Sequence, residues 1–186
     1  ISRGLVGSEM CIRDSFEMTK KLNIALIGCG SWGKNIARNL HQIGTLACIY
    51  DADRSLSKKL NQDFKLHNYT INDIFKNENI QALVIASSAK THRDIAEEAL
   101  KNNKDVLIEK PFCLSLNDAI TLSKLAIKKN KVLMAGHLLN YHNAFIKMQD
   151  LIREGKIGET KNIRAQRLAL GAIRSHESVI YDLAVH

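Results

Sequence analysis

Short apolar runs alternate along the chain with longer segments in which apolar residues recur at helical spacing. The runs that we interpret as strands lie at 22–27, 46–50, 82–86, 105–109 and 132–136, with a briefer candidate at 67–69. Helices are predicted after residue 33 and at 53–62, 72–76, 93–102 and 116–130. Continuous apolar runs are typical of parallel strands buried on both faces. Their alternation with helices predicts a doubly wound α/β sheet with right-handed crossovers.

The sequence also marks where three of these helices begin. Asp53 precedes a helical segment as an N-cap residue would. The patterns T-x-x-D from Thr91 to Asp94 and S-x-x-D from Ser115 to Asp118 predict capping boxes, in which the cap residue and the third helical residue exchange hydrogen bonds. These caps place the starts of the two later helices at residues 93 and 116.

The pattern changes after residue 136. An amphipathic helix is predicted at 142–154, and 161–170 alternates polar with apolar residues as a strand with one solvated face does. We expect the parallel sheet to form one domain over 18–136, and 137–186 to begin an α+β domain whose sheet is mainly antiparallel. Residues 1–17 lack the pattern of a signal peptide and resemble translated adapter sequence, so we expect a native start at Met18.

The first apolar run leads into three glycines at the spacing G-x-G-x-x-G. Gly28 is expected to permit a tight turn, Gly30 to let a pyrophosphate approach the backbone, and Gly33 to let the following helix pack closely on the strand. The second run ends at Asp51, where an acidic side chain holds the ribose hydroxyls of a dinucleotide. The strand, loop, helix and acid together favour dinucleotide binding over a plain glycine turn.

Composition narrows the classes of function. The formal net charge of +8 comes from lysines scattered along predicted helices, with no aromatic residues interleaved, which argues against nucleic-acid binding. No apolar run approaches the roughly 18 residues of a membrane span, so we expect a soluble protein without a membrane partner. The four cysteines show neither C-x-x-C pairing nor metal-ligand spacing. Such cysteines are typical of a reducing cytoplasm and predict no metal site.

Two positions carry groups suited to proton and hydride chemistry. Lys110 directly follows the strand predicted at 105–109, where its charge would stabilise a developing alkoxide, although a solvated surface lysine explains it at least as well. Asp182 and His186 have the i, i+4 spacing that on a helix lets a carboxylate orient an imidazole as a general base. A pair on a helix surface is an equally good interpretation of that spacing.

Several motifs together resemble one family, the glucose-fructose oxidoreductase and inositol dehydrogenase (Gfo/Idh/MocA) family. They are GCGSWGKN at 28–35, the strand-end Asp51, EKP at 109–111, GHLLNYHNAF at 136–145 and D-x-x-x-H at 182–186. The resemblance covers residues 19–186 in order and spacing. It implies a Rossmann cofactor domain followed by the N-terminal part of a substrate and oligomerisation domain. The remainder of that domain is expected beyond residue 186, and the full-length protein is expected to be a homo-oligomer.

The resemblance also implies roles for individual residues. Lys110 would be the catalytic lysine, His186 the acid-base residue and Asp182 its partner. The cofactor would be NAD, bound by Gly28, Gly30, Ser31, Trp32, Gly33, Asp51, Ser87, Ser88, His92, Glu109 and Lys110. The substrate would contact Lys110, His137, Tyr141, Arg167 and His186.

Substrate and cofactor preference are indicated by finer features. GCGSWGKN, GHLLNYH and RLALGAIRS at 167–175 are similar to dehydrogenases that oxidise carbon 3 of UDP-N-acetylglucosamine or its uronate. Asp51 favours NAD because its charge would repel the 2′-phosphate of NADP, although Arg54 could pair with that phosphate. We therefore expect hydride transfer between a sugar hydroxyl and NAD. The alternatives are a dehydrogenase of inositol or another polyol, and a non-catalytic NAD-binding sensor.

Overall fold

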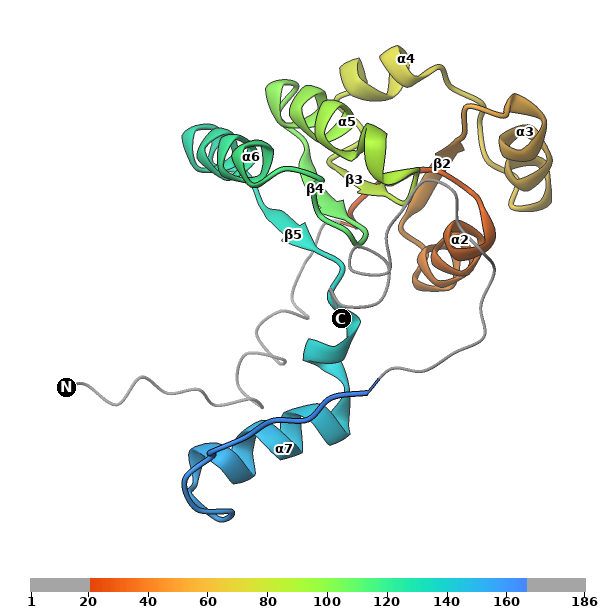
Figure 1. Cartoon of the computed structure of the whole chain (residues 1–186). Helices are drawn as coiled ribbons and strands as arrows, with labels where there is room; N and C mark the ends of the chain where they lie inside the picture. Colours follow the sequence, from red (N-terminus) through yellow and green to blue (C-terminus); the bar gives the residue numbers. More distant parts are fainter. Residues whose placement is uncertain (1–20, 167–186) are drawn as a thin grey trace.

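Five parallel strands form one sheet in the computed structural model of the protein, which describes residues 21–166 (Figure 1). They are β1 (Ile24–Ile27), β2 (Leu46–Tyr50), β3 (Ala82–Ile85), β4 (Asp105–Ile108) and β5 (Leu133–Ala135), in the spatial order β2-β1-β3-β4-β5. Every neighbouring pair is parallel, so the carboxyl ends of all the strands meet at the same edge. The predicted parallel α/β sheet is confirmed.

Helices cover both faces of the sheet. They are α2 (Ser31–Ile43), α3 (Arg54–Asp63), α4 (Ile71–Lys76), α5 (Ala89–Lys101), α6 (Leu116–Lys129), the 3₁₀ helix η1 (Leu138–Tyr141) and α7 (Asn143–Arg153). Figure 1 shows α5 and α6 on one face and α2 on the other. Within residues 21–166, no helix is both long enough and apolar enough to cross a membrane.

Alternate residues along the three central strands, β1, β3 and β4, belong to two separate cores. In β1, Ala25 and Ile27 join the core under α4, α5 and α6, whereas Leu26 joins the core under α2. All three side chains are at most 2% exposed, because the central strand is covered on both faces. This double burial is the physical reason for the continuous apolar runs in the sequence.

The structure confirms the helix starts predicted after Asp53 and Ser115 and contradicts the one predicted after Thr91. Asp53 caps α3 as predicted, since its carboxylate accepts a hydrogen bond from the backbone of the first turn. The Thr91 capping box is wrong, because α5 begins earlier, at Ala89, with Ser88 as its N-cap. Thr91 therefore lies inside the first turn, where its hydroxyl donates to the Ser88 carbonyl at 2.8 Å. Ser115 is the N-cap of α6, which begins at Leu116 as predicted, but the predicted capping box does not form because the Ser115 side chain makes no capping hydrogen bond.

The short strand predicted at 67–69 does not form. The outer edge of β2 is paired instead by the side chain of Asn61, which is 1% exposed. Its Oδ1 accepts from the Ile49 N–H and its Nδ2 donates to the Ile49 carbonyl, both at 2.9 Å. Nδ2 also donates to Asn68 Oδ1 at 3.0 Å, so one amide side chain takes the place of a neighbouring strand at this position.

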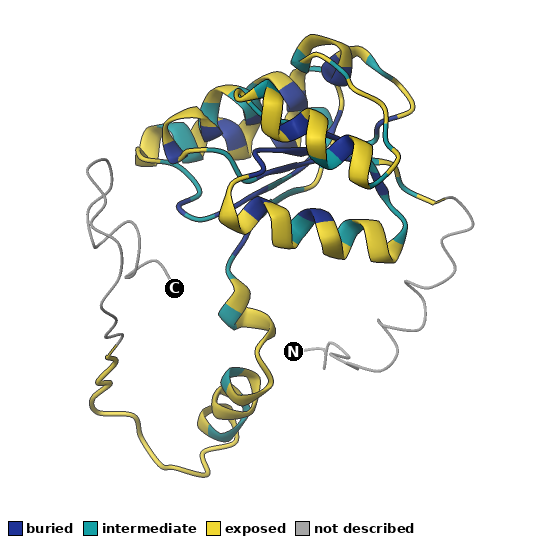
Figure 2. Ribbon diagram, turned by 90° about the vertical axis from the view of Figure 1, so that its right-hand side faces the viewer, coloured by how far each residue is buried: buried dark blue, intermediate teal, exposed yellow. Residues whose placement is uncertain are grey.

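The helix predicted at 142–154 is present as α7, which follows β5 and η1 in the chain. None of its residues is buried, and Figure 2 shows it apart from the buried layers of the sheet. Residues 161–166 form no strand, and the rest of the strand predicted at 161–170 lies outside the described residues. The described chain beyond β5 therefore holds only helices and irregular backbone.

Candidate functional site

The loop from β1 to α2 needs two of its glycines for its own geometry. Gly28 has φ +96°, and a Cβ there would lie 2.5 Å from Ser87 N and 2.6 Å from the Ala86 carbonyl oxygen. A Cβ at Gly33 would overlap the carbonyl oxygen of Gly28. A Cβ at Gly30, by contrast, would meet no atom within 4 Å. The space over Gly30 is therefore open, as close approach of a ligand to this backbone requires.

Helix α2 presents an N-terminus without a capping side chain. Gly30 is the N-cap residue, no side-chain hydrogen bond caps the helix, and its first turn contains no acidic residue. The first N–H groups of a helix have no partner within the helix, and its dipole places partial positive charge there. An anionic group such as a pyrophosphate is the ligand that this arrangement favours.

Two cavities meet at Gly30, Ala86 and Ser87. The first, here the β2-side cavity, has a volume of about 370 Å³ and is lined by Ile27, Gly28, Gly30, Tyr50, Asp51, Ala52, Ala86, Ser87, Ser88, Thr91 and Ile95. The second, the β4-side cavity, has about 360 Å³ and is lined by Gly30, Ser31, Trp32, Gly33, Ala86, Ser87, Ala89, Glu109 and Lys110. Two cavities joined at an anion-binding helix N-terminus match the two halves of a dinucleotide.

Asp51 forms the polar wall of the β2-side cavity. Its Oδ2 accepts from the Cys29 N–H at 2.7 Å and its Oδ1 accepts from the Asp53 N–H at 2.9 Å. These bonds hold the carboxylate beside the glycine loop while its remaining lone pairs can accept ribose hydroxyls. Cys29 packs beneath the loop, where burial, then the hydrogen bond and charge of Asp51, raise the pKa of its thiol to about 12.

The Arg54 side chain makes its contacts outside that cavity. Its guanidinium lies over the Tyr50 ring, 5.0 Å from the centroid, and its Nη1 donates to the Tyr69 carbonyl at 3.0 Å. Tyr50 lines the β2-side cavity, but Arg54 does not. A pairing of Arg54 with a 2′-phosphate would therefore require it to leave both partners.

The end of β4 supplies the charged wall of the β4-side cavity. Glu109 is 8% exposed, and Lys110 N–H donates to its Oε2 at 3.3 Å. A Cβ at Gly136 would lie 3.1 Å from the carboxyl carbon and both oxygens of Glu109, so the absence of a side chain at Gly136 provides the room for this carboxylate. Lys110 lines the cavity together with Trp32, and the Lys110–Pro111 peptide bond is cis.

His92 lies beneath the site and lines neither cavity. The side chain comes from α5 and is 1% exposed. Its Nδ1 is 2.8 Å from the Pro111 carbonyl oxygen and its Nε2 is 3.0 Å from the Ser87 carbonyl oxygen. Both ring nitrogens thus face the backbone of segments that border the cavities.

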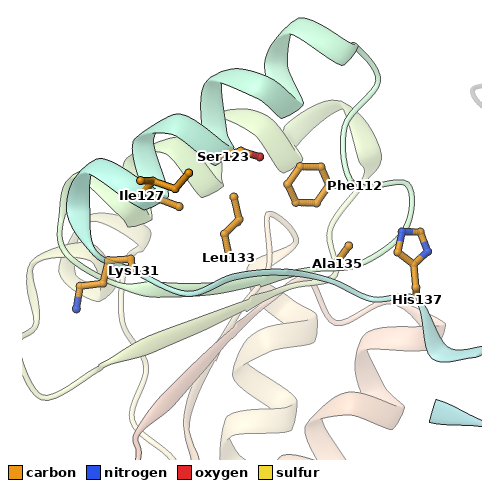
Figure 3. Close-up of a pocket in the computed structure, with 8 residues that line it drawn as sticks. Phe112, Ser123, Ile127, Lys131, Leu133, Ala135 and His137 are labelled. Carbon is orange, nitrogen blue, oxygen red and sulfur yellow. The ribbon is translucent and has the colours of Figure 1, made fainter. Parts of the chain in front are cut away.

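The predicted substrate residues are spread more widely. His137 lies at one end of a separate cavity of about 490 Å³ between α6 and β5 (Figure 3). Tyr141, on η1, is 66% exposed and lines none of the three cavities. Arg167, Asp182 and His186 lie outside the described residues.

Some cavity residues were not predicted from the sequence. Tyr50, Ala52, Ala86, Thr91 and Ile95 line the β2-side cavity. The Thr91 hydroxyl also lies 2.8 Å from that of Ser87. The available signal was position alone, because these residues end a strand or occupy the first turns of the next helix, at the edge where ligands of such sheets bind.

This combination of a parallel sheet, a glycine loop that opens onto an uncapped helix, and a strand-end acid defines a dinucleotide-binding Rossmann domain. Residues 22–137 match the family model described as "Oxidoreductase family, NAD-binding Rossmann fold". The chain belongs to the Gfo/Idh/MocA family, and the matched region is its NAD-binding domain.

Relatives of known name perform different reactions. The chain is 28% identical over 149 residues to 2,7-anhydro-N-acetylneuraminate hydratase of Escherichia coli K12, covering 78% of this chain and 40% of the relative. It is 28% identical over 166 residues to UDP-N-acetylglucosamine 3-dehydrogenase of Acidithiobacillus ferrooxidans, covering 89% and 51%. It is 25% identical over 177 residues to myo-inositol 2-dehydrogenase of Thermotoga maritima, covering 89% and 52%. The chain thus spans about half the length of these relatives or less.

A solved structure agrees with the fold. GenD2 from gentamicin A biosynthesis, in complex with NAD, superposes with a TM-score of 0.70 at 26% identity. The superposition covers 75% of this chain and 41% of GenD2. This chain therefore spans less than half of the solved protein.

Proposed function

We propose that the chain is the cofactor domain and first substrate-domain segment of an NAD-dependent dehydrogenase that oxidises a hydroxyl of a sugar or sugar nucleotide. The observation that carries the proposal is the place of Lys110, in one cavity with Trp32 and Gly30. A fixed cation at the end of β4 suits an alkoxide that develops beside a cofactor bound along the glycine loop.

Bound NAD would supply the hydride acceptor. Gly30 and the first turn of α2 would hold its pyrophosphate, and Asp51 would accept hydrogen bonds from the adenosine ribose. Lys110 holds the substrate hydroxyl and stabilises its developing negative charge. His186 takes the hydroxyl proton as general base, and Asp182 orients its imidazole.

The cofactor contacts favour NAD over NADP. The Asp51 carboxylate would repel a 2′-phosphate, and Arg54, the nearest cation along the chain, is held by Tyr50 and Tyr69. Discrimination against NADP then rests on the repulsion between Asp51 and the 2′-phosphate, which Arg54 does not offset.

The substrate that we favour is a UDP-N-acetylglucosamine-type sugar nucleotide, because the relative named for it is 28% identical over 89% of this chain, against 25% over the same share for myo-inositol 2-dehydrogenase. An inositol or another polyol is the second candidate, supported by the relative from Thermotoga maritima. One relative is named a hydratase, so the assay must also detect substrates that gain or lose water.

The test uses the complete protein with NAD and three candidate substrates, UDP-N-acetylglucosamine, its uronate and myo-inositol. Reduction of NAD is followed by absorbance, and products are checked by mass spectrometry for hydration. Lys110→Ala is expected to lower turnover by at least about 100-fold, as loss of a stabiliser of an oxyanion does. NAD affinity should change by no more than about twofold, because adenosine and pyrophosphate contacts remain.

Lys90→Ala is the matched control. Lys90 is an exposed lysine in the first turn of α5 and lines neither cofactor cavity. Equal turnover in the wild-type protein and Lys110→Ala would refute the role of Lys110. NAD binding without conversion of any substrate would favour the non-catalytic sensor.

A further inference from the structure

His92 connects two backbone segments that are otherwise far apart in the sequence. The Ser87 carbonyl, 3.0 Å from Nε2, belongs to the segment after β3 that walls both cofactor cavities. The Pro111 carbonyl, 2.8 Å from Nδ1, belongs to the residue that follows Lys110. The imidazole therefore bridges the cofactor wall and the lysine segment from below.

The Pro111 contact is well suited to locate this segment. Proline has no N–H, so its carbonyl is the backbone group through which Pro111 can form hydrogen bonds. Residues 109–115, between β4 and α6, contain no helix or strand that would hold them by a regular ladder. A side chain that is 1% exposed, on the ordered helix α5, gives the segment a rigid reference point.

The two ring nitrogens of a neutral His92 cannot both donate a hydrogen bond. A neutral imidazole carries one N–H, so it donates to only one of the two carbonyls, whichever tautomer forms. The two contacts are therefore separable, and substitution can keep one while removing the other.

We infer that His92 is a positioning residue, which through its contact with the Pro111 carbonyl sets where Lys110 lies beside the bound cofactor. The inference rests on the proposed function in that it gives Lys110 a place next to NAD. The Nδ1 contact with Pro111 is the one that matters for Lys110, because Pro111 directly follows the lysine in the chain.

Two amide variants separate the contacts. The side-chain nitrogen of His92→Asn reaches the position of Nδ1 and can still donate to the Pro111 carbonyl. The longer side chain of His92→Gln reaches the position of Nε2 and can donate to Ser87 instead. Both variants are neutral and polar, and both place a donor in the same buried site.

The readout is the acetylation of Lys110 by isotopically labelled acetic anhydride, measured by peptide mass spectrometry with and without NAD. NAD should slow this labelling in the wild-type chain and in His92→Asn. In His92→Gln the protection should fall by about two- to tenfold, the effect of losing one hydrogen bond. Cofactor affinity, followed by quenching of Trp32, the single tryptophan of the chain, should stay within about twofold in all three proteins.

Thermal unfolding of each protein separates positioning from general destabilisation. Equal protection in the two variants, or equal loss with a matched fall in melting temperature, would overturn the inference and leave the proposed function intact. Absence of NAD protection in the wild-type chain would overturn both, because Lys110 would then not lie beside the cofactor. In the complete protein, His92→Asn should retain the turnover that His92→Gln loses.

Discussion

Replacing Gly30 by alanine should abolish tight cofactor binding while leaving the fold nearly as stable as before. Gly30 has φ −61° and ψ −167°, which alanine adopts without strain, and its Cβ would meet no protein atom within 4 Å. Alanine is a poorer N-cap than glycine, but it lowers the entropy of the unfolded chain by an amount worth about 0.4–1 kcal/mol. The net change in unfolding free energy should stay within about 1 kcal/mol, or about 2–4 °C in melting temperature.

The methyl group would occupy the space through which a pyrophosphate reaches the N–H groups of α2. Each lost hydrogen bond to a charged oxygen costs about 1.5–3 kcal/mol. Loss of a single such bond therefore raises the dissociation constant of NAD about 10- to 150-fold.

Gly28→Ala is the matched comparison, because the two glycines lie in the same loop. At φ +96° an alanine costs about 1–2 kcal/mol, and its contact with backbone atoms at 2.5–2.6 Å adds about 1–3 kcal/mol of overpacking. The protein without cofactor should lose about 4–20 °C in melting temperature.

Circular dichroism during heating measures stability, and quenching of Trp32, which lines the β4-side cavity, measures NAD binding. Wild-type affinity in Gly30→Ala would refute the assignment of this space to the cofactor. A melting temperature as low as that of Gly28→Ala would refute the distinction between the two glycines.

Four further outcomes can be checked on the same chain. Asp51→Asn should weaken NAD binding about 10- to 100-fold in a Trp fluorescence titration, through loss of charged hydrogen bonds. Arg54→Ala should leave the dissociation constant of NADP within about twofold, since Arg54 is held by other partners; a larger loss would show that Arg54 reaches the 2′-phosphate. Asn61→Leu leaves a buried N–H and carbonyl of β2 unpaired and should cost about 2–6 kcal/mol in urea unfolding, whereas an unchanged midpoint would contradict the edge pairing. Burial raises the pKa of both Cys29 and Cys48 from 9.0 to about 12. The unfolded chain loses these protons first, so their contribution to stability is complete below pH 9.0 and is lost toward about pH 12. Alkylation of Cys29 and Cys48 by iodoacetamide at pH 9, measured by peptide mass spectrometry, should be slow until the chain unfolds, and fast reaction of these two residues in the folded protein would contradict this.

The strands and the cofactor loop were predictable from local sequence. A strand buried on both faces leaves a continuous apolar run, and a loop that needs glycine at φ +96° leaves a glycine. The false strand at 67–69 shows the limit of this reasoning. Three residues, His67 to Tyr69, are too few to give a reliable strand signal, and the edge of β2 is occupied by the side chain of Asn61.

Helix starts were less predictable, because a capping pattern such as T-x-x-D can also occur within the first turn of a helix. The sequence around Thr91 fits an N-cap, yet the end of β3 brings the chain into α5 at Ala89. The same hydroxyl then donates to the Ser88 carbonyl. Where a helix begins is decided by where the preceding strand delivers the chain as well as by its capping residues.

The parallel sheet, the glycine loop and the strand-end Asp51 could be derived from the sequence alone, because each depends on neighbouring residues and on burial that repeats along the chain. How the side chains around the loop are engaged depends instead on tertiary packing. This packing holds Arg54 against Tyr50 and the Tyr69 carbonyl, and it places His92 between two carbonyls of distant segments. Such partners meet through the packing of strands and helices, so their pairing leaves no periodic signal in the sequence.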